Sequence, residues 1–400
     1  MPENRKTEPP SKFSSSESAT KNSSGSAQNS SSEAAQTFEQ RKADHIQLSM
    51  DPRTQTSDQN YLDFLQLIPE ALPEINFSEV TLDSTFHGLK YSAPFYIGSM
   101  TAGHQGSLSI NRALSKLSHD EQILMGVGSQ RKELFDPTAA AEWKQLRQEF
   151  PKVRWAGNVG ITQLITSTDN ELLKLRDHLQ AEVFFIHLNA LQEALQKEGT
   201  PQFRGGLKAL EKAVKILEIP VVLKEVGCGI AAPTLEKLRG IGLAAVDVNG
   251  KGGTHWGRIE TYRHDSESLG HDVGETFKNW GLSTLECLLE ANSIKSSRNL
   301  DYEIWASGGV RSGLDVAKFI ALGAQFIGIA QPWLAACLAA PEESDTNLKR
   351  LFQRVKKELQ IALFITGCKT PEELRRRQPW AWNTFLKASQ NSTSSKDWKP

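Results

Sequence analysis

Short apolar runs alternate with amphipathic stretches along the chain from Pro94 onward. Each run has the length of a strand buried on both faces, and the stretches between, such as 206–219, repeat apolar residues at helical spacing. This alternation is typical of β–α–β units in a parallel sheet. Eight units of this kind predict a (β/α)8 TIM barrel of the α/β class. The eight predicted strands are Phe95–Met100, Ile123–Val127, Val153–Gly157, Val183–Leu188, Val221–Glu225, Ala244–Val248, Ile304–Ser307 and Phe326–Ala330.

The pattern differs in three other parts of the chain. Residues 1–37 are dominated by Ser with other polar residues, and such a segment cannot offset the entropy of ordering. We predict a disordered tail there, favoured over a Ser-rich transit peptide because the segment contains acidic residues. A second flexible tail is predicted at 388–400, with one barrel domain at 38–387 between them. The long connection Gly250–Ser283 predicts a functional lid loop.

Composition narrows the class of protein. The chain has 400 residues, 38% of them hydrophobic, and a net charge of −1, which gives no electrostatic case for binding nucleic acid or a membrane surface. Its four cysteines are far apart in sequence, which fits a reducing compartment and argues against a structural zinc site. No apolar run has the length of a membrane helix, and the N-terminus lacks a signal peptide's apolar centre. We expect a soluble, cytoplasmic protein.

The segment from Ile304 to Ala330 contains a glycine-rich turn that is typical of phosphate-binding sites. Ser307-Gly308-Gly309 forms a turn without bulky side chains between a predicted strand and a predicted helix. The free N–H groups and the dipole of a helix N-terminus favour a phosphate, and Arg311 adds a cation with fork geometry. In barrels of this kind the phosphate commonly binds after the seventh and eighth strands. A turn kept only for packing is the alternative.

Other predicted strands also end in small or polar groups. Catalytic and binding residues of a barrel lie at the carboxyl ends of its strands. A lysine at the mouth of a barrel, such as Lys224, is costly unless it meets an anion or an electron-poor ring. Each of these ends alone is explained by turn chemistry, but the whole series is not explained by packing. The groups concerned are Ser99, Met100 and Thr101; Ser129, Gln130 and Arg131; Asn158; Lys224; and Thr254.

The fourth strand ends in an unusually polar sequence. His187, Asn189, Gln192 and Glu193 place an imidazole, two amides and a carboxylate together. A carboxylate suits Mg²⁺, which usually keeps several waters and bridges to a substrate phosphate. Zn²⁺ is less well supported because no second His or Cys stands nearby. Earlier in the chain, Arg41 and Lys42 form a basic pair that either is solvated or closes over an anionic substrate.

These strand ends resemble those of barrels that bind FMN, and several motifs are more specific. The segments RKADHI, GVGSQR, HLNALQE, VDVNGKGGTHW and ASGGVRSGLD resemble the type 2, FMN-dependent isopentenyl-diphosphate isomerases over about residues 38–374. The turn MTAGH differs from the family's more usual MTGG, which places Ala102 beside the flavin. The Ser-rich extension also lies outside the family pattern.

The resemblance implies roles for individual residues. His187, Asn189 and Gln192 are implied as catalytic residues and Glu193 as the Mg²⁺ ligand. The substrate diphosphate is implied to contact Arg41, Lys42, Ser129, Gln130, Arg131 and Gln192. The implied FMN-binding residues are Ser99, Met100, Thr101, Ser129, Asn158, Lys224, Thr254, Gly309, Val310, Arg311, Ala330 and Gln331.

The resemblance also implies an activity and partners. The expected reaction is the isomerisation of isopentenyl diphosphate to dimethylallyl diphosphate in isoprenoid biosynthesis. Reduced FMN, formed by NADPH or NADH, is expected to supply the acid–base group, with Mg²⁺ on the diphosphate. Family members tend to assemble as homo-tetramers or octamers. Trp256 is a candidate to wall off the prenyl group, or to serve in packing alone.

Two other functions stay open at this stage. An FMN-dependent 2-hydroxy-acid oxidase or dehydrogenase needs a His base with a nearby Arg after the sixth or seventh strand. His255 and Arg258 are the candidates, although their KGGTHW context differs from what that chemistry requires. The other alternative is a flavin-free barrel that only binds phosphometabolites.

Overall fold

The computed structural model describes residues 39–56, 61–100, 105–297 and 299–383. The chain divides into two compact units, residues 1–41 and 42–400. In the first unit the described residues are 39–41, which are helical, and in the second residues 42–49 are helical. The predicted tails 1–37 and 388–400 lie outside the described residues, so the predicted domain limits stay predictions.

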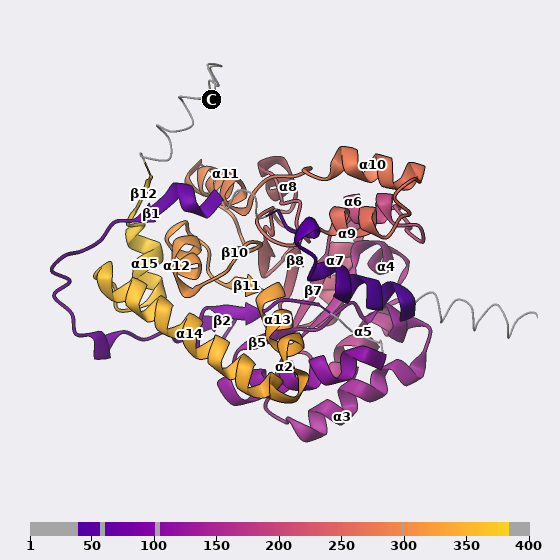
Figure 1. Cartoon of the computed structure of the whole chain (residues 1–400), viewed down its shortest axis with the longest axis horizontal. Coiled ribbons are helices and arrows are strands. Elements are labelled where there is room, and N and C mark those ends of the chain that lie inside the picture. The colour runs from indigo at the N-terminus through magenta and orange to yellow at the C-terminus, as the bar shows by residue number, and fades with distance from the viewer. Residues whose placement is uncertain (1–38, 57–60, 101–104, 298, 384–400) are drawn as a thin grey trace, which may run out of the picture. The chain divides into compact units, whose positions relative to one another are not determined.

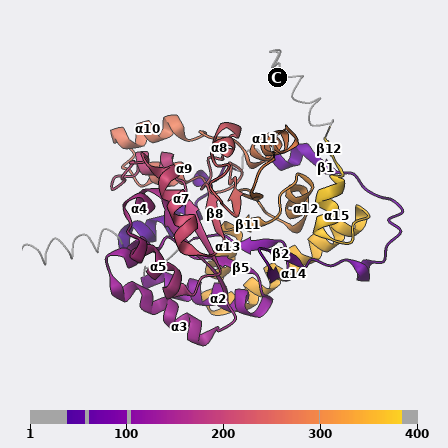
Figure 2. The same ribbon diagram turned by 180° about the vertical axis from the view of Figure 1, so that it is seen from behind.

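The second unit contains a closed barrel of eight parallel strands (Figures 1 and 2). All eight predicted strands are confirmed, with ends that differ by at most three residues. The register places His187 beside Lys224, and Lys224 beside Asp247, at the carboxyl ends of neighbouring strands. In barrel order the strands are β4 (Phe95–Ile97), β5 (Leu124–Gly126), β6 (Arg154–Gly160), β7 (Val183–His187), β8 (Val221–Lys224), β9 (Ala245–Asp247), β10 (Glu303–Ser307) and β11 (Ile327–Ile329).

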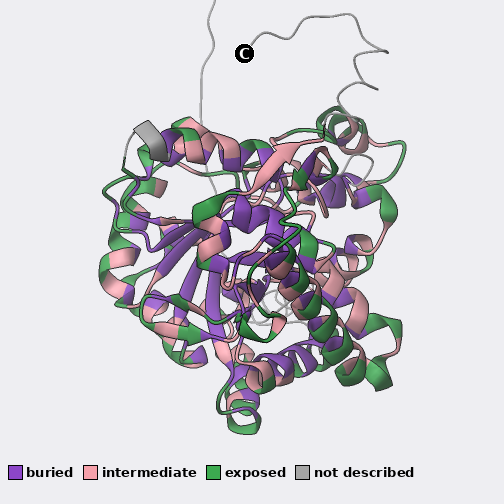
Figure 3. Ribbon diagram, turned by 90° about the vertical axis from the view of Figure 1, so that its left-hand side faces the viewer, coloured by how far each residue is buried: buried purple, intermediate pink, exposed green. Residues whose placement is uncertain are grey.

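Helices cover the outside of the barrel, with buried inner faces and exposed outer faces (Figure 3). In α7, for example, Leu210, Ala213 and Leu217 recur at helical spacing and are buried. The helices are α2 (Leu108–Glu121), α3 (Ala141–Glu149), α4 (Ile161–Thr166), α5 (Asp169–Leu179), α6 (Ala190–Leu195), α7 (Gly206–Leu217), α8 (Ala232–Lys237), α9 (Trp256–Tyr262), α10 (Leu269–Phe277), α11 (Thr284–Ser297), α12 (Gly313–Ala321), α13 (Gln331–Ala339), α14 (Ser344–Ile365) and α15 (Pro371–Arg377).

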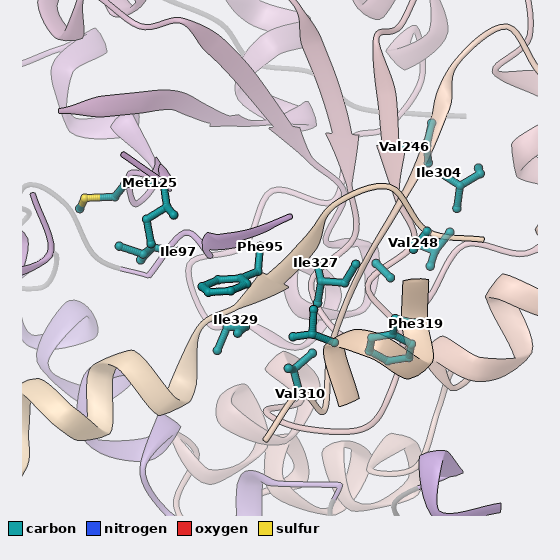
Figure 4. Packing of buried hydrophobic residues seen from close by; sticks show 14 of the residues in the cluster. Phe95, Ile97, Met125, Val246, Val248, Ile304, Val310, Phe319, Ile327 and Ile329 are labelled. Carbon is teal, nitrogen blue, oxygen red and sulfur yellow. The ribbon is translucent and has the colours of Figure 1, made fainter. Parts of the chain in front are cut away.

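The strands divide their side chains between two hydrophobic clusters. Along β4, Phe95 and Ile97 belong to the cluster between barrel and helices, whereas Tyr96 belongs to the cluster inside the barrel. Figure 4 shows part of the outer cluster, where Ile327 lies near Phe319 of α12. Successive residues of a strand point to opposite faces, so a strand buried on both faces reads as a continuous apolar run. This is the pattern from which the strands were predicted.

A small antiparallel sheet closes the inner cluster. It consists of β2 (Ser84–Phe86) and β3 (Leu89–Tyr91). Phe86 packs edge-on against Trp305 with ring centroids 4.7 Å apart, and Tyr91 packs against Phe326 at 5.6 Å. The interior of the barrel is therefore filled with aromatic rings rather than open.

The connection Gly250–Ser283 is more ordered than the predicted lid loop. It contains α9 and α10, and within it His255, Glu260 and Thr261 are fully buried. His255 caps α9 by accepting a hydrogen bond from the Arg258 N–H. The prediction of a loop was wrong because the glycines and charges of this segment concealed two short helices that pack through buried polar groups.

Two further features complete the second unit. Strand β1 (Leu65–Leu67) pairs with β12 (Trp380–Trp382) as an antiparallel pair outside the barrel. Thr370 caps α15, since its hydroxyl accepts a hydrogen bond from the Glu373 N–H. Among the described residues, no helix combines the length and apolar character needed to cross a membrane.

Candidate active site

A pocket lies at the carboxyl ends of several barrel strands. It is lined by residues that follow β4, β9 and β11 and by the helical residues 42–49. Thr101, which the sequence also assigns to FMN, lies outside the described residues. Six of the predicted site residues line the pocket: Lys42, Ser99, Met100, Thr254, Ala330 and Gln331.

Two glycine turns pack backbone against backbone beside this pocket. Gly308 and Gly309 have φ angles of +97° and +83°, which side chains rarely adopt. A Cβ on Gly309 would lie 2.7 Å from the Gly252 carbonyl oxygen. The Thr284 hydroxyl joins the turns, because it accepts from the Gly250 N–H and donates to the Ser307 carbonyl. The missing side chains are therefore explained by the packing of one turn against the other, which is the alternative left open by the sequence, and a phosphate role for these turns stays a prediction.

The helix that the sequence assigned to the phosphate is already capped by protein groups. In α12 the Asp315 N–H is bonded to Ser312, and the Gly313 N–H donates to Glu358. Arg311 pairs with Asp63 and Asp315, at 3.1 and 3.3 Å, and does not line the pocket. This geometry favours a different helix N-terminus for the phosphate, and the role of Arg311 stays a prediction.

Helix α13 presents its N-terminus to the pocket instead. Ala330 precedes the helix and Gln331 begins it, and both line the pocket. Ala330 has no side-chain oxygen with which to cap the first N–H groups of the helix. Pro332 has no N–H and the Trp333 N–H donates to the Ala330 carbonyl, so the start of α13 offers an anion the Gln331 N–H and the helix dipole.

One polar atom in the pocket supports a bound ligand. The Ser99 hydroxyl is buried, lines the pocket, and finds no hydrogen-bond partner among the described residues. Buried hydroxyls in folded proteins are almost always hydrogen-bonded. A group such as FMN, with many polar ring atoms, would satisfy it, so the donors present fit that cofactor.

The polar strand ends of β5, β6 and β7 are joined by hydrogen bonds. Asn158 donates from its side-chain nitrogen to the Val127 carbonyl, and its side-chain oxygen lies 2.9 Å from His187 Nδ1. Because that oxygen only accepts, His187 carries its proton on Nδ1. The neutral ring then presents Nε2 as an acceptor.

Charge and burial keep this imidazole neutral. Burial, followed by the charges of Lys224 and Lys42, lowers the pKa of His187 to about 3. His187 is therefore uncharged at neutral pH and is not an acid there. Its Nε2 is therefore available as an oriented hydrogen-bond acceptor.

Lys224 sits among buried acidic groups at the end of β8. Its Nζ donates to the Glu225 carbonyl at 3.0 Å. Burial lowers the pKa of Lys224, and the charges of Asp247 and Glu225 act in the opposite direction. Asp247 is fully buried and accepts from Tyr96 and Ser307. Burial raises the pKa of Glu225 to about 7, so Glu225 provides only part of the negative surroundings that a buried ammonium group needs.

The motif after β7 forms a cluster around Asn189. Its side-chain nitrogen lies 3.0 Å from Glu193 Oε1 and 3.3 Å from Gln192 Oε1. The other oxygen of Glu193 accepts from the Thr200 N–H. The Asn189 Oδ1 is buried without a hydrogen-bond partner among the described residues. The Asn189 nitrogen, and not its oxygen, faces Glu193, so the group in this cluster that suits Mg²⁺ is the carboxylate alone.

The described residues hold no group of three or more His, Cys, Asp or Glu side chains placed to bind a metal ion. A Zn²⁺ site made only of such side chains is therefore not supported in this part of the chain. Mg²⁺ differs, because it is commonly held by one or two carboxylates together with waters and substrate phosphates.

Two residues that sequence reasoning did not assign join the cluster to the pocket. Glu260 of α9 is fully buried, and it accepts from Gln192 at 3.0 Å and Arg263 at 2.7 Å. His45 lies 2.9 Å from Glu260 and packs edge-on against Trp256, and both rings line the pocket. Burial would raise the pKa of Glu260, but His45 and Arg263 outweigh it and lower that pKa. The only signal for these residues in the sequence is the run of polar residues around Trp256.

The remaining predicted substrate-binding residues follow β5 on a 3-10 helix, η5 (Gln130–Leu134), which Ser129 precedes. Arg131 is half-buried and makes no ion pair with other described residues. Gln130 is buried, and its amide is bonded to the Leu175 carbonyl and the Asn158 N–H. These bonds favour a supporting role for Gln130 over direct contact with substrate. Arg41 lies in the first unit, and its predicted role stays a prediction.

The residues proposed for hydroxy-acid oxidation serve the protein's own structure. His255 Nε2 lies 2.9 Å from the Trp280 carbonyl, and its Nδ1 accepts from the Arg258 N–H. The Arg258 guanidinium donates to the Lys278 carbonyl, the Gln55 carbonyl and Asn279. With both groups committed to main-chain contacts, this pair is unsuited to hold and oxidise a carboxylate substrate.

Relatives of known name match most of the chain. A model of the FMN-dependent dehydrogenase family matches residues 34–381. The chain is 46% identical over 345 residues to the isopentenyl-diphosphate delta-isomerase of Bdellovibrio bacteriovorus, covering 85% of this chain and 97% of the relative. The enzyme of the same name from Legionella pneumophila strain Corby is 45% identical, with coverage of 85% and 97%. That from Nostoc sp. is 37% identical, with coverage of 86% and 96%.

Solved structures share the fold at lower identity. The flavin-binding domain of baker's yeast flavocytochrome b2 superposes with a TM-score of 0.60 at 19% identity, covering 88% of this chain and 86% of that one. A lactate oxidase of Pediococcus acidilactici gives 0.55 at 15%, with coverage of 79% and 82%. These two show the barrel fold alone. The family model and the relatives show more: the chain belongs to the FMN-dependent dehydrogenase family and, within it, to the type 2 isopentenyl-diphosphate delta-isomerases.

Proposed function

We propose that the protein converts isopentenyl diphosphate into dimethylallyl diphosphate. The observation that carries this proposal is the neutral, oriented imidazole at the end of β7, together with the amides and the carboxylate that follow it. His187 is an acceptor fixed by Asn158, and Asn189, Gln192 and Glu193 lie next to it. The names of the relatives support the same reaction.

The chemistry sets strict demands on this site. The reaction adds a proton at one carbon and removes one from another, with no net transfer of electrons. An unactivated alkene is a very weak base, so a positioned acid and exclusion of water are required. His187, Asn189 and Gln192 do not supply a strong acid, since the imidazole is neutral and amides do not ionise. Reduced FMN, when bound, supplies the acid–base group through its ring nitrogen.

The protein's own residues would hold and orient this cofactor. The start of α13 and the two glycine turns are suited to the phosphate, and the Ser99 hydroxyl to a polar ring atom. Lys224 would place a positive charge beside the ring. Asn158 and His187 would orient a hydrogen bond at its face, and Trp256 with His45 would exclude water from the prenyl group.

The diphosphate would be held at the opposite end of the substrate. Glu193 is suited to Mg²⁺, which would neutralise part of the diphosphate charge. Lys42 and Arg131, with Arg41 and Ser129, would contribute the remaining donors. Fixing this end places the alkene for proton transfer without an acid on the protein. NADPH or NADH would serve only to reduce FMN, and assembly into a homo-tetramer or octamer stays a prediction.

The decisive experiment follows labelled isopentenyl diphosphate. Purified protein is supplied with FMN, Mg²⁺ and NADPH, and the labelled product is identified by mass and chromatography. Dimethylallyl diphosphate should form with reductant and not with oxidised FMN alone. Consumption of lactate or mandelate without turnover of isopentenyl diphosphate would contradict the proposal. A colourless protein that takes up no FMN would favour the flavin-free alternative.

The Mg²⁺ assignment has its own test. Replacing Glu193 with Gln removes the charge and should raise the Mg²⁺ concentration needed for half-maximal activity by about tenfold or more. The affinity for FMN should not change, because the proposal assigns Glu193 to the diphosphate end of the substrate. An unchanged Mg²⁺ requirement would contradict the assignment of Glu193 as the metal ligand.

A further inference from the structure

Helix α10 carries a row of apolar side chains on its exposed side. Leu269, Val273 and Phe277 recur every four residues, so they lie one above the other along the helix. Their exposed fractions are 79%, 40% and 37%, and Trp280, just beyond the helix, is 60% exposed. The rings of Phe277 and Trp280 contact each other edge-on, with centroids 6.0 Å apart. We call these four residues the α10 ridge.

The opposite side of α10 packs through glycines against α9 and the turn after it. Of the residues of α10, all of which the structure describes, only Gly274 is buried. A Cβ at Gly274 would collide with the side chain of Thr261, and a Cβ at Gly270 with that of His264. Figures 1 and 2 show α10 beside α9. A surface helix usually turns its apolar side to the core, so the arrangement of α10 is the reverse of the usual one.

A row of this kind indicates contact with another molecule. Single apolar residues on a surface are ordinary, but a contiguous apolar patch with a polar border marks an interaction site. Asp272 and Thr276 border the α10 ridge on the same helix and are exposed. None of the four ridge residues lines the pocket. The patch is therefore separate from the candidate active site.

The charges at the two ends of α10 favour an antiparallel second copy as the occupant. Asp265 and Glu267 precede the helix, and Asp272 lies in its first turn. Lys278 follows its last residue, and Lys251 donates to the carbonyl of the residue after that. An antiparallel copy would set each acidic end and each helix dipole against its opposite, whereas a parallel copy would set like charges together. A membrane surface suits this helix less, because interfacial helices carry mainly Lys and Arg beside their apolar side.

We propose that the α10 ridge packs against the same ridge of a second copy of this chain, around a two-fold axis near Val273. The spacing supports this axis, because Leu269 and Phe277 lie four residues to either side of Val273. Two-fold contacts use one surface on both copies and are the commonest in soluble oligomers. Leu269 of each copy then meets Phe277 of the other. A stable contact buries about 800 Å² from each partner, so the ridge forms its core and the charged ends of α10 belong to its rim.

The contact lies next to the elements that carry the active site. Helix α9, on which α10 packs, begins with Trp256, which lines the pocket. The Trp280 carbonyl lies 2.9 Å from Nε2 of His255, the residue before Trp256. Pairing of two copies would therefore cover α9 from outside. The contact does not depend on the proposed reaction, because it is tested by mass without any substrate.

The test measures the mass of the purified full chain by analytical ultracentrifugation at micromolar concentrations. Leu269→Asp places a carboxylate in the ridge. Leu207→Asp is the matched control, because Leu207 is an exposed leucine of α7 followed by Lys208. Both leucines are exposed in the single copy, so both variants should fold, and circular dichroism checks that they do.

The unmodified chain should form an assembly with an even number of copies, and Leu269→Asp should have half its mass. The dissociation constant of the contact should rise by about 100-fold or more, because a carboxylate would be buried against an aromatic ring without a partner. Leu207→Asp should keep the unmodified mass. A monomeric unmodified chain, one mass for all three proteins, or an equal loss of mass in both variants would overturn the inference.

A cross-link tests the position of the axis. Val273→Cys brings two thiols together at the axis, and mild oxidation should join two copies, since a disulfide needs Cα atoms within about 7 Å. Leu207→Cys and the unmodified chain, whose own cysteines are buried or half-buried, should give no linked pair. Absence of a linked pair from Val273→Cys would overturn the antiparallel arrangement. Binding to phosphatidylserine vesicles that Leu269→Asp abolishes, with no change of mass, would identify a membrane surface as the occupant and overturn the second copy.

Discussion

The mouth of the barrel has two walls built on different principles. One, the backbone wall, comprises Gly252, Gly308, Gly309 and the start of α13, and it presents main-chain groups where side chains are missing. The other, the side-chain wall, comprises His45, Asn158, His187, Gln192 and Glu260, and it presents side chains whose bonds depend on one another. Atoms added to the glycines of the backbone wall would clash with neighbouring main-chain atoms. In the side-chain wall, replacing a hydrogen-bond donor or acceptor would break the bonds of its partners. A cofactor phosphate needs close approach, and a reacting alkene needs fixed, neutral dipoles.

The largest expected effect comes from adding one carbon to the backbone wall. Gly309→Ala would place a Cβ 2.7 Å from main-chain atoms of Gly252 at a φ of +83°. We expect a loss of roughly 3–5 kcal/mol of stability, combining backbone strain with overpacking, and loss of FMN binding. Urea unfolding and titration of FMN fluorescence measure both.

Gly240 offers a matched control for that substitution. It has a φ of +77°, and a Cβ there would meet nothing within 4 Å. Gly240→Ala therefore isolates the conformational cost of about 1–2 kcal/mol. Equal losses of unfolding free energy in Gly309→Ala and Gly240→Ala would show that the close contact between the glycine turns does not prevent the addition of a Cβ.

The side-chain wall should respond to a change of charge without a change of shape. Glu260→Gln keeps the volume but removes the carboxylate that His45, Gln192 and Arg263 share. We expect kcat/KM to fall by about 10- to 100-fold, since supporting contacts of this kind usually have that effect. Glu198→Gln alters another partner of Arg263 on the exposed side and should change stability by less than about 1 kcal/mol. Similar losses of kcat/KM in the Glu260→Gln and Glu198→Gln variants would contradict a role for Glu260 in supporting the active site.

The neutrality of His187 makes the stability of the fold depend on pH. Its pKa is about 3 in the folded protein and 6.5 in an unfolded chain. The unfolded chain takes up a proton below pH 6.5, so the stability associated with the neutral ring is complete above pH 6.5 and lost as the pH falls toward 3. The stability lost from this source between pH 7 and pH 5 is about 1–2 kcal/mol. Urea unfolding of His187→Asn should show a shallower decline over that range, and an identical decline would indicate a charged His187.

The smallest expected effect concerns the ion pair beside the backbone wall. Asp63 and Arg311 are both half-exposed, and such pairs contribute less than about 1 kcal/mol. Asp63→Asn should therefore leave stability nearly unchanged. It should also leave FMN affinity within about twofold, because α13 rather than Arg311 faces the pocket. Markedly tighter FMN binding by Asp63→Asn would show that Asp63 competes with the phosphate for Arg311. That result would support the sequence-based assignment of Arg311 to the FMN phosphate.

The barrel itself could be predicted because its signal is local. Strands buried on both faces must be apolar at successive positions, and Tyr96 and Phe95 illustrate this by entering different clusters. The order of strands around a parallel barrel then follows from the chain. That order brings strand-end residues such as Lys224 and His187 together.

The hydrogen-bond network could not be predicted, because its members are distant in sequence. Glu260 looks like an ordinary helix-surface carboxylate until His45, 215 residues away, is placed against it. Arg311 looks like a phosphate ligand until Asp63, 248 residues away, is paired with it. The buried side of Gln130 depends on the path of η5, which no periodicity encodes. The polar residues at strand ends can thus be identified from the sequence, whereas the direction in which each side chain points cannot.

The pairing of β1 with β12 has a consequence for how the polypeptide matures. Leu65 finds its neighbour only when Trp382 has left the ribosome, so a segment made early waits roughly a quarter of a minute to a minute at ordinary rates of synthesis. During that interval the hydrogen-bonding edge of residues 65–67 is exposed to other chains. We therefore expect a chaperone to protect the nascent chain until β12 has been synthesised and can pair with β1.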